Sequence, residues 1–212
     1  MIRSLLFPDK CVLCKKILES GQMDLCTGCR IEAPQWHKPK EKIPFIKELL
    51  ALWHYEGNVR SSLLRYKFYG KRSYHIAYGR LLAMKLLEEW DGEFDLITWV
   101  PISRRRKFRR GYDQVELLAR AVSRELGIPC GPVLKKIRHN PPQSGITGSA
   151  HRRANVLNVY QARNSEQFAG KRILLLDDIV TTGATVSECA RVLLTAGAKE
   201  VYCAAIAAKH HK

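Results

Sequence analysis

Residues 172–185, RILLLDDIVTTGAT, constrain the fold of this 212-residue chain more than any other segment. Four apolar residues, Ile173 to Leu176, come directly before two acids, and a short turn of threonine and glycine follows. Apolar residues then recur at helical spacing over 184–196, and Gly197 stands where a left-handed residue commonly closes a helix. The segment is therefore predicted to form a strand, a loop and a helix.

The same alternation of apolar strands and amphipathic helices runs through the second half of the chain. Strands are predicted at 96–102, 172–177 and 201–208, with helices at 113–126 and 184–196. This order is typical of an α/β fold in which crossover helices flank a parallel sheet.

The N-terminal part differs in composition from the rest. Residues 1–40 hold four of the seven cysteines, and the charged, proline-containing stretch 36–44 suits a linker. A chain of this length has room for one α/β domain of about 150 to 170 residues beside a small module. The predicted domains are a four-cysteine module at 1–40 and a main domain at 45–212, with a helical part at 45–92 and a core at 93–212. The helical part is predicted to contain a strand at 49–56 and helices at 59–69 and 74–90.

The loop of the strand–loop–helix segment has the chemistry of a sugar-phosphate site. Open α/β sheets bind ligands at the carboxyl ends of their strands, and a helix N-terminus offers unpaired N–H groups to a phosphate. A phosphate is expected against Thr181 to Thr185, where Gly183 lets the backbone approach closely. Ionised Asp177 and Asp178 only accept hydrogen bonds, which suits sugar hydroxyls. A structural turn capped by the aspartates is the alternative.

Two cysteine pairs, Cys11-x2-Cys14 and Cys26-x2-Cys29, are separated by 11 residues. Four thiolates at this spacing suit a tetrahedral structural zinc ion that folds the module or docks a partner. A redox pair is the alternative, but two pairs so close together, with no strand before them, favour a metal. The other cysteines are predicted to be buried thiols: Cys130, Cys189 and Cys203.

Two segments are strongly basic, and the first follows the strand predicted at 96–102. Residues 103–113, SRRRKFRRGYD, carry six positive charges between Arg104 and Arg110, and arginine forks suit a diphosphate. A solvated basic loop is the alternative. The connection 135–156 is basic and rich in proline and glycine, and loops longer than about 12–15 residues are usually functional. No G-x-x-x-x-G-K-[ST] or G-x-G-x-x-G motif is present, which argues against P-loop ATPases and dinucleotide-binding proteins.

The segment 172–185 resembles the signature with which type I phosphoribosyltransferases bind phosphoribosyl pyrophosphate (PRPP). The resemblance implies that the acids contact the ribose hydroxyls, that the following backbone holds the 5′-phosphate and that 135–156 is a mobile lid. If the chain is catalytic, Asp177 and Asp178 hold the ribose near an oxocarbenium-like state while Mg²⁺ neutralises pyrophosphate. The residues predicted to bind PRPP are Asp177, Asp178, Ile179, Val180, Thr181, Thr182, Gly183, Ala184 and Thr185. Candidates for pyrophosphate and lid contacts are Lys67, Ser103, Arg110, Gln143 and Arg153. A surface lysine is the alternative for Lys67.

Motifs along nearly the whole chain resemble the ComF family of competence-associated proteins. They are the two cysteine pairs, YKFYG at 66–70, VPIS at 100–103, RRGYDQ at 109–114, Gln143, R-x-N at 153–155 and the PRPP loop. The resemblance implies a type I phosphoribosyltransferase fold with an N-terminal zinc ribbon and a role in uptake of single-stranded DNA during natural transformation. One departure is Asp113, where relatives commonly have Asn, which weakens any contact between this position and pyrophosphate.

The formal net charge of +16 predicts an anionic partner without separating nucleic acid from phosphorylated metabolites or acidic lipid. The first ten residues contain no secretory apolar region, and no segment approaches the ~18 consecutive apolar residues of a membrane span. A cytoplasmic protein is expected, with peripheral membrane association left open.

Two functions from different classes fit these features. The first is an enzyme that transfers phosphoribose from PRPP to an unidentified acceptor. The second is a non-enzymatic module that binds single-stranded DNA or docks on competence-machinery proteins, with a vestigial or sensory PRPP site. In the second, aromatic residues between cations would stack on bases, with core packing as the alternative: Tyr66, Phe68, Tyr69, Phe108 and Tyr112. A zinc-dependent interaction protein with an inactive transferase fold is a third hypothesis.

Overall fold

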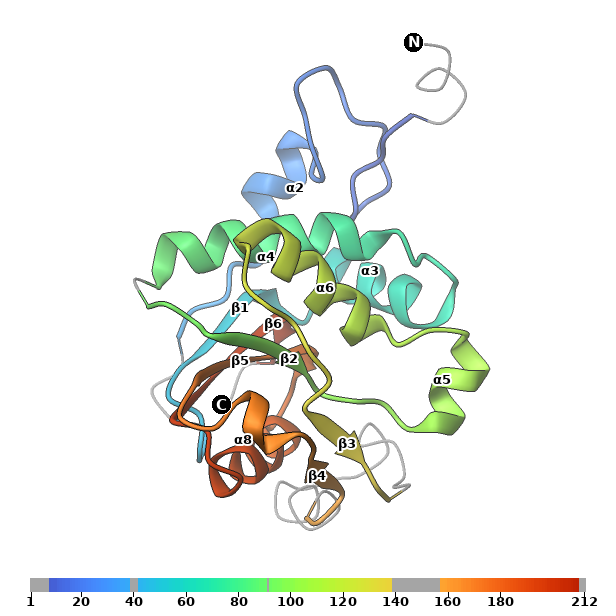
Figure 1. The fold of residues 1–212 in the computed structure, drawn as a ribbon. Helices are drawn as coiled ribbons and strands as arrows, with labels where there is room; N and C mark the ends of the chain where they lie inside the picture. The colour runs from blue at the N-terminus through green and yellow to red at the C-terminus, as the bar shows by residue number, and fades with distance from the viewer. Residues whose placement is uncertain (1–7, 39–41, 91, 139–156, 210–212) are drawn as a thin grey trace.

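A parallel four-stranded sheet forms the centre of the molecule (Figure 1). The structure is a computed structural model and describes residues 8–38, 42–90, 92–138 and 157–209. The strand order is β1-β6-β5-β2, and every neighbouring pair is parallel. The strands are β1 (Leu49–His54), β2 (Leu96–Trp99), β5 (Arg172–Val180) and β6 (Glu200–Ala208). The α/β prediction with a parallel sheet is confirmed.

Helices cover both faces of this sheet, because the apolar side chains of its strands alternate between two hydrophobic clusters. Leu174 and Leu176 of β5 pack with α3, α4 and α6, whereas Ile173 and Leu175 pack with α8 (Figure 1). The helices are α3 (Gly57–Phe68), α4 (Tyr74–Glu89), α6 (Gln114–Leu126) and α8 (Ala184–Thr195).

Shorter elements lie at the margins of the sheet. Strands β3 (Leu134–Lys136) and β4 (Tyr160–Ala162) form a separate antiparallel pair, and the 3-10 helix η2 (Ser165–Gln167) follows. The segment predicted as a lid, 135–156, therefore begins as a strand. The rest of that segment from residue 139, with Gln143 and Arg153, lies outside the described residues.

The basic segment 103–113, predicted as a loop, is largely helical, and this prediction was wrong. Helix α5 (Arg104–Arg110) forms because the hydroxyl of Ser103 accepts a hydrogen bond from the Arg106 N–H at 3.4 Å. Unbranched arginines are good helix formers, and Gly111 closes the helix with a φ of 76°. The loop was predicted from the clustered charge, and the capping residues on either side of it were not considered.

Strand β5 continues beyond its predicted end at 177. Strand β6 runs alongside it as far as the pair Val180 and Ala208, so both aspartates belong to the strand. Only residues 181–183 separate β5 from α8. Strand β2 is shorter than predicted, since its last pair joins Trp99 to Leu176 and Pro101 has no N–H to donate.

The N-terminal cysteine module packs against α3 and α4. It contains the short helix α2 (Thr27–Glu32), and its residues Val12 and Leu13 belong to the same hydrophobic cluster as Leu63 and Tyr66 of α3. Polar contacts reinforce this packing: Ser62 donates to the Val12 carbonyl, Arg65 donates to the Leu13 carbonyl, and Arg80 of α4 forms an ion pair with Asp24. The module and the main domain share one core in the part of the chain that the structure describes.

Candidate sugar-phosphate site and metal centre

The turn from β5 to α8 brings backbone N–H groups to the carboxyl edge of the sheet. The first-turn N–H groups of a helix have no partner within the helix, and α8 begins at Ala184. Gly183 precedes it with a φ of 71°, and an added Cβ there would lie 2.7 Å from the side chain of Ile43. The hydroxyl of Thr182 is buried without a hydrogen-bond partner. A glycine is therefore required at 183, and the turn retains polar groups for a ligand.

Two acids lie near the end of β5, two residues before this turn, and hydrogen-bond or ion-pair partners hold both carboxylate oxygens of Asp178. Its Oδ1 lies 2.8 Å from the Lys67 ammonium, and its Oδ2 accepts a hydrogen bond of 2.9 Å from Nε2 of Gln114. Burial and the charge of Asp178 raise the pKa of Asp177 well above its usual value. Since the side chain of Lys67 is only 19% exposed, the alternative of a surface lysine was wrong.

A cavity of about 610 Å³ opens beside these acids and is strongly cationic. Seven cationic side chains line it against two carboxylates, those of Asp177 and Asp178. The seven are Arg60, Lys67, Arg106, Arg109, Arg110, Lys136 and Lys209. Thr181 and Thr185 of the turn also line the cavity. The cavity is therefore suited to an anion that also carries hydroxyl groups.

Two of these cations hold donors that have no partner among the described residues. Nη2 of Arg106 and Nε of Arg110 are buried without a hydrogen bond. Burial lowers the pKa of Arg110, and burial together with the charge of Arg106 lowers the pKa of Lys136 to about 8. Bringing an anion into the cavity would satisfy the unpaired donors and offset the crowding of like charges.

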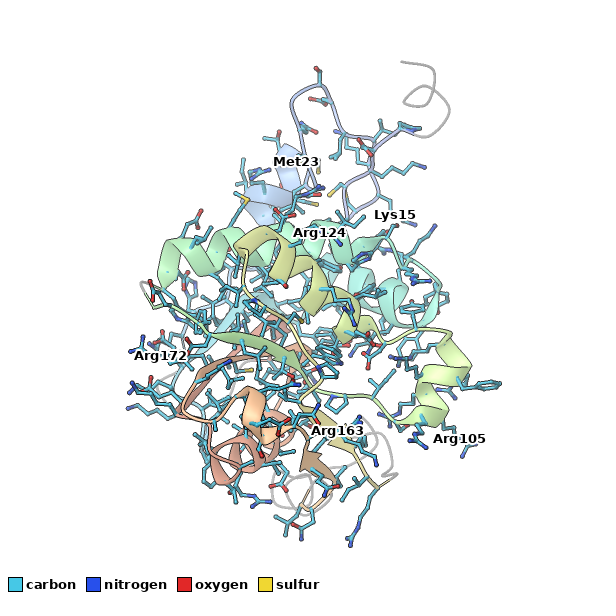
Figure 2. All side chains as sticks on the ribbon, viewed as in Figure 1. Lys15, Met23, Arg105, Arg124, Arg163 and Arg172 are labelled. Atoms are coloured by element: carbon cyan, nitrogen blue, oxygen red, sulfur yellow. The ribbon has the colours of Figure 1, made fainter. Side chains whose placement is uncertain are left out.

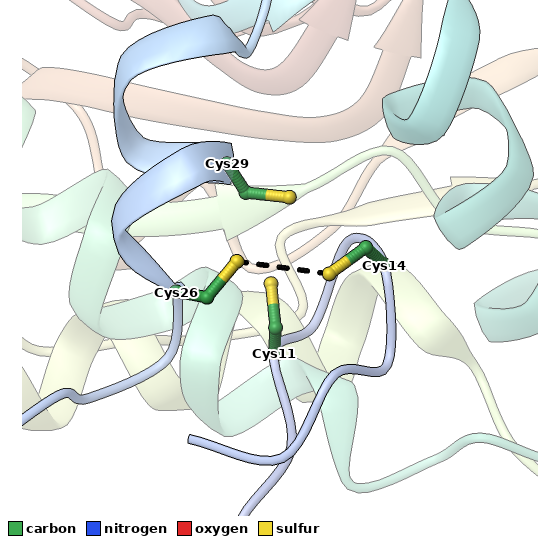
Figure 3. A group of neighbouring side chains, drawn as sticks. All are labelled: Cys11, Cys14, Cys26 and Cys29. Carbon is green, nitrogen blue, oxygen red and sulfur yellow. Dashed lines mark hydrogen bonds between the residues drawn. The ribbon is translucent and has the colours of Figure 1, made fainter. Parts of the chain in front are cut away.

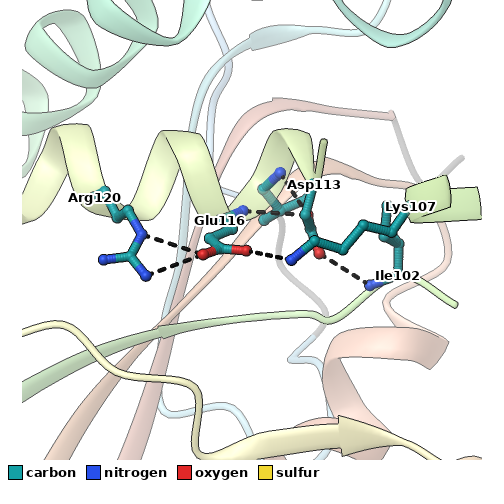
Figure 4. A network of polar contacts seen from close by, with 6 residues as sticks. Ile102, Lys107, Asp113, Glu116 and Arg120 are labelled. Atoms are coloured by element: carbon teal, nitrogen blue, oxygen red, sulfur yellow. Dashed lines mark hydrogen bonds and ion pairs between the residues drawn. The ribbon is translucent and has the colours of Figure 1, made fainter. Parts of the chain in front are cut away.

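The remaining predicted contacts are placed differently. Ser103 caps α5 and does not line the cavity, whereas Arg110 does. The carboxylate of Asp113 caps α6 by accepting hydrogen bonds from the N–H groups of Val115 and Glu116 at 3.0 and 3.2 Å (Figure 4). Burial raises the pKa of Asp113, although the backbone donors oppose this. Asp113 is thus occupied by helix capping, a role that asparagine fills equally well.

Six cationic or amide side chains of the cavity were not singled out as ligands from the sequence: Arg106, Arg109, Arg60, Gln114, Lys136 and Lys209. Helical spacing would have found the first, because Arg106 and Arg110 are four residues apart and face the same side of a helix. Nothing local marks Lys136, which reaches the cavity from the β3–β4 pair.

The aromatic residues considered for base stacking separate into two groups. Tyr66 is fully buried and donates to the Gln114 carbonyl at 2.5 Å, so its assignment as a stacking platform was wrong. Tyr112 is half-buried and donates to the Tyr66 carbonyl. Phe68, Tyr69 and Phe108 are exposed by 57, 72 and 93%. Phe68 and Tyr69 lie at the C-terminal end of α3, and Phe108 lies within α5; both helices are basic.

The four N-terminal cysteines converge on one point (Figure 3). Their Sγ atoms all lie within 4.8 Å of one another, and those of Cys14 and Cys26 are 3.7 Å apart. A tetrahedron with Zn–S bonds of about 2.3 Å has an edge of about 3.8 Å, so the donor set fits such an ion. Burial acts to raise the pKa of Cys11, but backbone hydrogen bonds, from Cys14 first, bring it down to about 7. The cluster is suited to a metal such as zinc.

Positive charge is not confined to the cavity. Arg105, Arg124 and Arg172 lie on separate parts of the molecule (Figure 2). No helix among the described residues is long and apolar enough to cross a membrane.

Comparisons with known proteins agree with this geometry. Residues 116–212 match the family described as phosphoribosyl transferase domain. Competence protein F of Haemophilus influenzae is 26% identical, over 92% of this chain and 95% of that protein. The DNA utilization protein YhgH of Escherichia coli (strain K12) is 28% identical, over 90% of this chain and 86% of its own. Competence protein ComFC of Bacillus subtilis is 24% identical, over 82% of this chain and 67% of that protein.

Proposed function

We propose that this chain, a phosphoribosyltransferase-like protein of the ComF family, binds PRPP in the cationic cavity at the carboxyl edge of its sheet. The proposal rests on one observation: groups that bind anions and groups that bind hydroxyls lie together in one cavity. The α8 N-terminus suits a phosphate, the two carboxylates suit hydroxyls, and the unpaired arginine donors suit a second anionic group. PRPP presents these three groups in one molecule.

Each part of the cavity then has a role. Residues Thr181 to Thr185 hold the 5′-phosphate, and Asp177 and Asp178 hold the ribose hydroxyls. Arg106, Arg110 and Lys136 hold the pyrophosphate. Mg²⁺ bound with PRPP neutralises part of the pyrophosphate charge.

In a transfer reaction, the bond from C1 of the ribose to pyrophosphate breaks, and its electron pair leaves with the pyrophosphate. The acceptor's lone pair forms the new bond to C1. Arg106 and Arg110 stabilise the negative charge that grows on the leaving group, and Asp177 and Asp178 stabilise the positive charge that grows on the ring.

Calorimetric titration of PRPP with Mg²⁺ tests binding. The wild type is expected to bind, and Asp178→Ala is expected to bind at least about tenfold more weakly, since it loses an acceptor and the partner of Lys67. Glu166→Gln, an exposed change on η2 outside the cavity, is the matched control and should bind as the wild type does. A wild type that does not bind PRPP would refute the proposal.

Pyrophosphate release in the presence of a panel of acceptors then tests transfer. If no acceptor yields pyrophosphate, the transfer activity is refuted.

A second function, binding of single-stranded DNA during DNA uptake, is favoured by the exposed rings of Phe68, Tyr69 and Phe108 among cations. The names of the relatives, competence protein and DNA utilization protein, support the same role. Anisotropy of a labelled oligothymidine should show binding that weakens steeply with salt and weakens further in Phe108→Ala. Phe45→Ala, which removes a ring of 51% exposure outside the basic helices, is the control. Binding that stays constant up to ~0.2 M salt would contradict this function.

The metal of the four-cysteine cluster is proposed to be zinc with a structural role, because all four positions of a tetrahedron are filled by thiolates. Metal analysis of the purified chain should find one zinc per chain, and Cys29→Ser should lose it.

A further inference from the structure

Gln114 occupies a fixed position at the inner wall of the PRPP cavity. It is the first residue of α6, it is 3% exposed, and it lines the cavity beside Asp178. Its backbone carbonyl accepts the hydrogen bond from the buried Tyr66 hydroxyl at 2.5 Å. The backbone of Gln114 is therefore held in place.

The orientation of its amide follows from its neighbour. Nε2 lies 2.9 Å from Oδ2 of Asp178, whose other oxygen is paired with the Lys67 ammonium. An ionised carboxylate only accepts hydrogen bonds, so the amide nitrogen must face Asp178 and the amide oxygen must face away from it.

That amide oxygen is left without a partner. Oε1 of Gln114 is buried and accepts no hydrogen bond from the described residues. A buried polar atom without a partner is uncommon and calls for an explanation. A phosphate oxygen cannot fill this role because it also accepts. A ligand group that donates a hydrogen bond, such as a hydroxyl, completes the site.

We infer that Gln114 Oε1 accepts a hydrogen bond from one ribose hydroxyl while the two aspartates hold the adjacent hydroxyl. This inference rests on the proposed function and adds a specificity residue to it. Lys67 and Gln114 leave Asp178 room for a further donor, since a carboxylate offers about four lone-pair directions. The pair selects a vicinal diol, because a sugar that lacks one hydroxyl leaves a buried acceptor unpaired.

Titration calorimetry with ribose 5-phosphate and its 2-deoxy and 3-deoxy analogues tests the inference. The wild type should bind ribose 5-phosphate about tenfold or more tightly than the analogue lacking the hydroxyl held by Gln114. In Gln114→Met, which keeps the side-chain length and removes both the acceptor and the amide donor to Asp178, that preference should fall to within about twofold. Affinity for magnesium pyrophosphate should change little. Gln161→Met, an exposed change on β4, is the matched control and should keep the wild-type preference.

If Gln114→Met binds ribose 5-phosphate and retains the wild-type preference against both analogues, the inference is overturned while the proposed function stands. A wild type that binds neither ribose 5-phosphate nor pyrophosphate overturns both. If the methionine variant does not fold, Gln114→Asn replaces it. Asparagine keeps the amide on a side chain that is one methylene shorter, so its oxygen lies farther from the ligand and the same preference should fall. An unchanged preference in the asparagine variant counts against Gln114 as a ligand.

Discussion

At the scale of single residues, the side chain of Asp178 is held in position in the ligand-free site. Lys67 from α3 and Gln114 from α6 hold the two oxygens of Asp178, so three elements meet on one carboxylate. The aspartates and the turn after them could be predicted because they form one contiguous string. Lys67 and Lys136 could not be placed from the sequence, because only the folding of the chain brings α3 and β3 to the cavity.

Replacing Lys67 by methionine tests the ion pair with Asp178. The variant leaves a carboxylate of 6% exposure with one donor fewer, and we expect it to lose about 1–3 kcal/mol in free energy of unfolding. PRPP affinity should also fall. Urea denaturation measures the first effect, with the exposed Lys71→Met as control. A variant as stable as the wild type would show that the ion pair contributes nothing to the fold.

The lowered pKa of Lys136 predicts a pH dependence of PRPP affinity. Below pH 8 its ammonium is charged and attracts the anion, and above pH 8 it becomes neutral. If bound PRPP raises this pKa by about one unit, affinity should fall about sevenfold between pH 7 and 9.5. Phosphate groups, with a second pKa of about 6, stay ionised throughout this range. Titrations at several pH values should show the fall in the wild type and a flat profile in Lys136→Met.

At the scale of elements, helix caps and close helix contacts determine the positions of the helices that surround the cavity. Helix α5 was missed because its capping serine and closing glycine stand beside six charges, and the charges suggested a solvated loop. The position of α6 depends instead on Asp113, whose carboxylate accepts from the first-turn N–H groups.

The Asp113 cap gives a prediction that separates capping from ligand contact. Asp113→Ala should lose about 1 kcal/mol of stability, whereas Asp113→Asn should remain close to the wild type. Urea denaturation of the three proteins checks this. A strong loss of PRPP affinity in the stable asparagine variant would contradict the assignment of Asp113 to capping.

The packing of α4 on α6 depends on Gly79. A Cβ added there would lie 2.4 Å from the Cβ of Ala121, so Gly79→Ala must push the helices apart. We expect a loss of about 1–3 kcal/mol, despite the gain in helix propensity. Thermal unfolding should show the loss and its partial recovery in the double variant with Ala121→Gly. If the double variant is no more stable than Gly79→Ala, the contact between these two positions is not the cause of the loss.

At the scale of the whole molecule, the order of strands and helices gave the α/β class and the parallel sheet, because each buried strand is a short apolar run. The shared core of the cysteine module and α3 was not foreseen. It depends on contacts between residues about 50 positions apart, such as Ser62 with Val12, which no local pattern marks.

This shared core predicts that metal removal weakens the entire chain. Chelation under reducing conditions should lower the temperature of a single unfolding transition, because Val12 and Leu13 pack with Leu63 and Tyr66. Cys29→Ser should behave in the same way, whereas Cys130→Ser, outside the four-cysteine cluster, should keep its metal. Loss of module structure with an unchanged transition for the remainder would show two independent units.

The most direct test of the central claim is a crystal structure of the chain with PRPP and Mg²⁺. We expect the 5′-phosphate within about 2.7–3.2 Å of backbone nitrogens between Thr181 and Thr185, with the pyrophosphate on Arg106 and Arg110. PRPP bound in the reverse orientation, or outside the cavity, would contradict it.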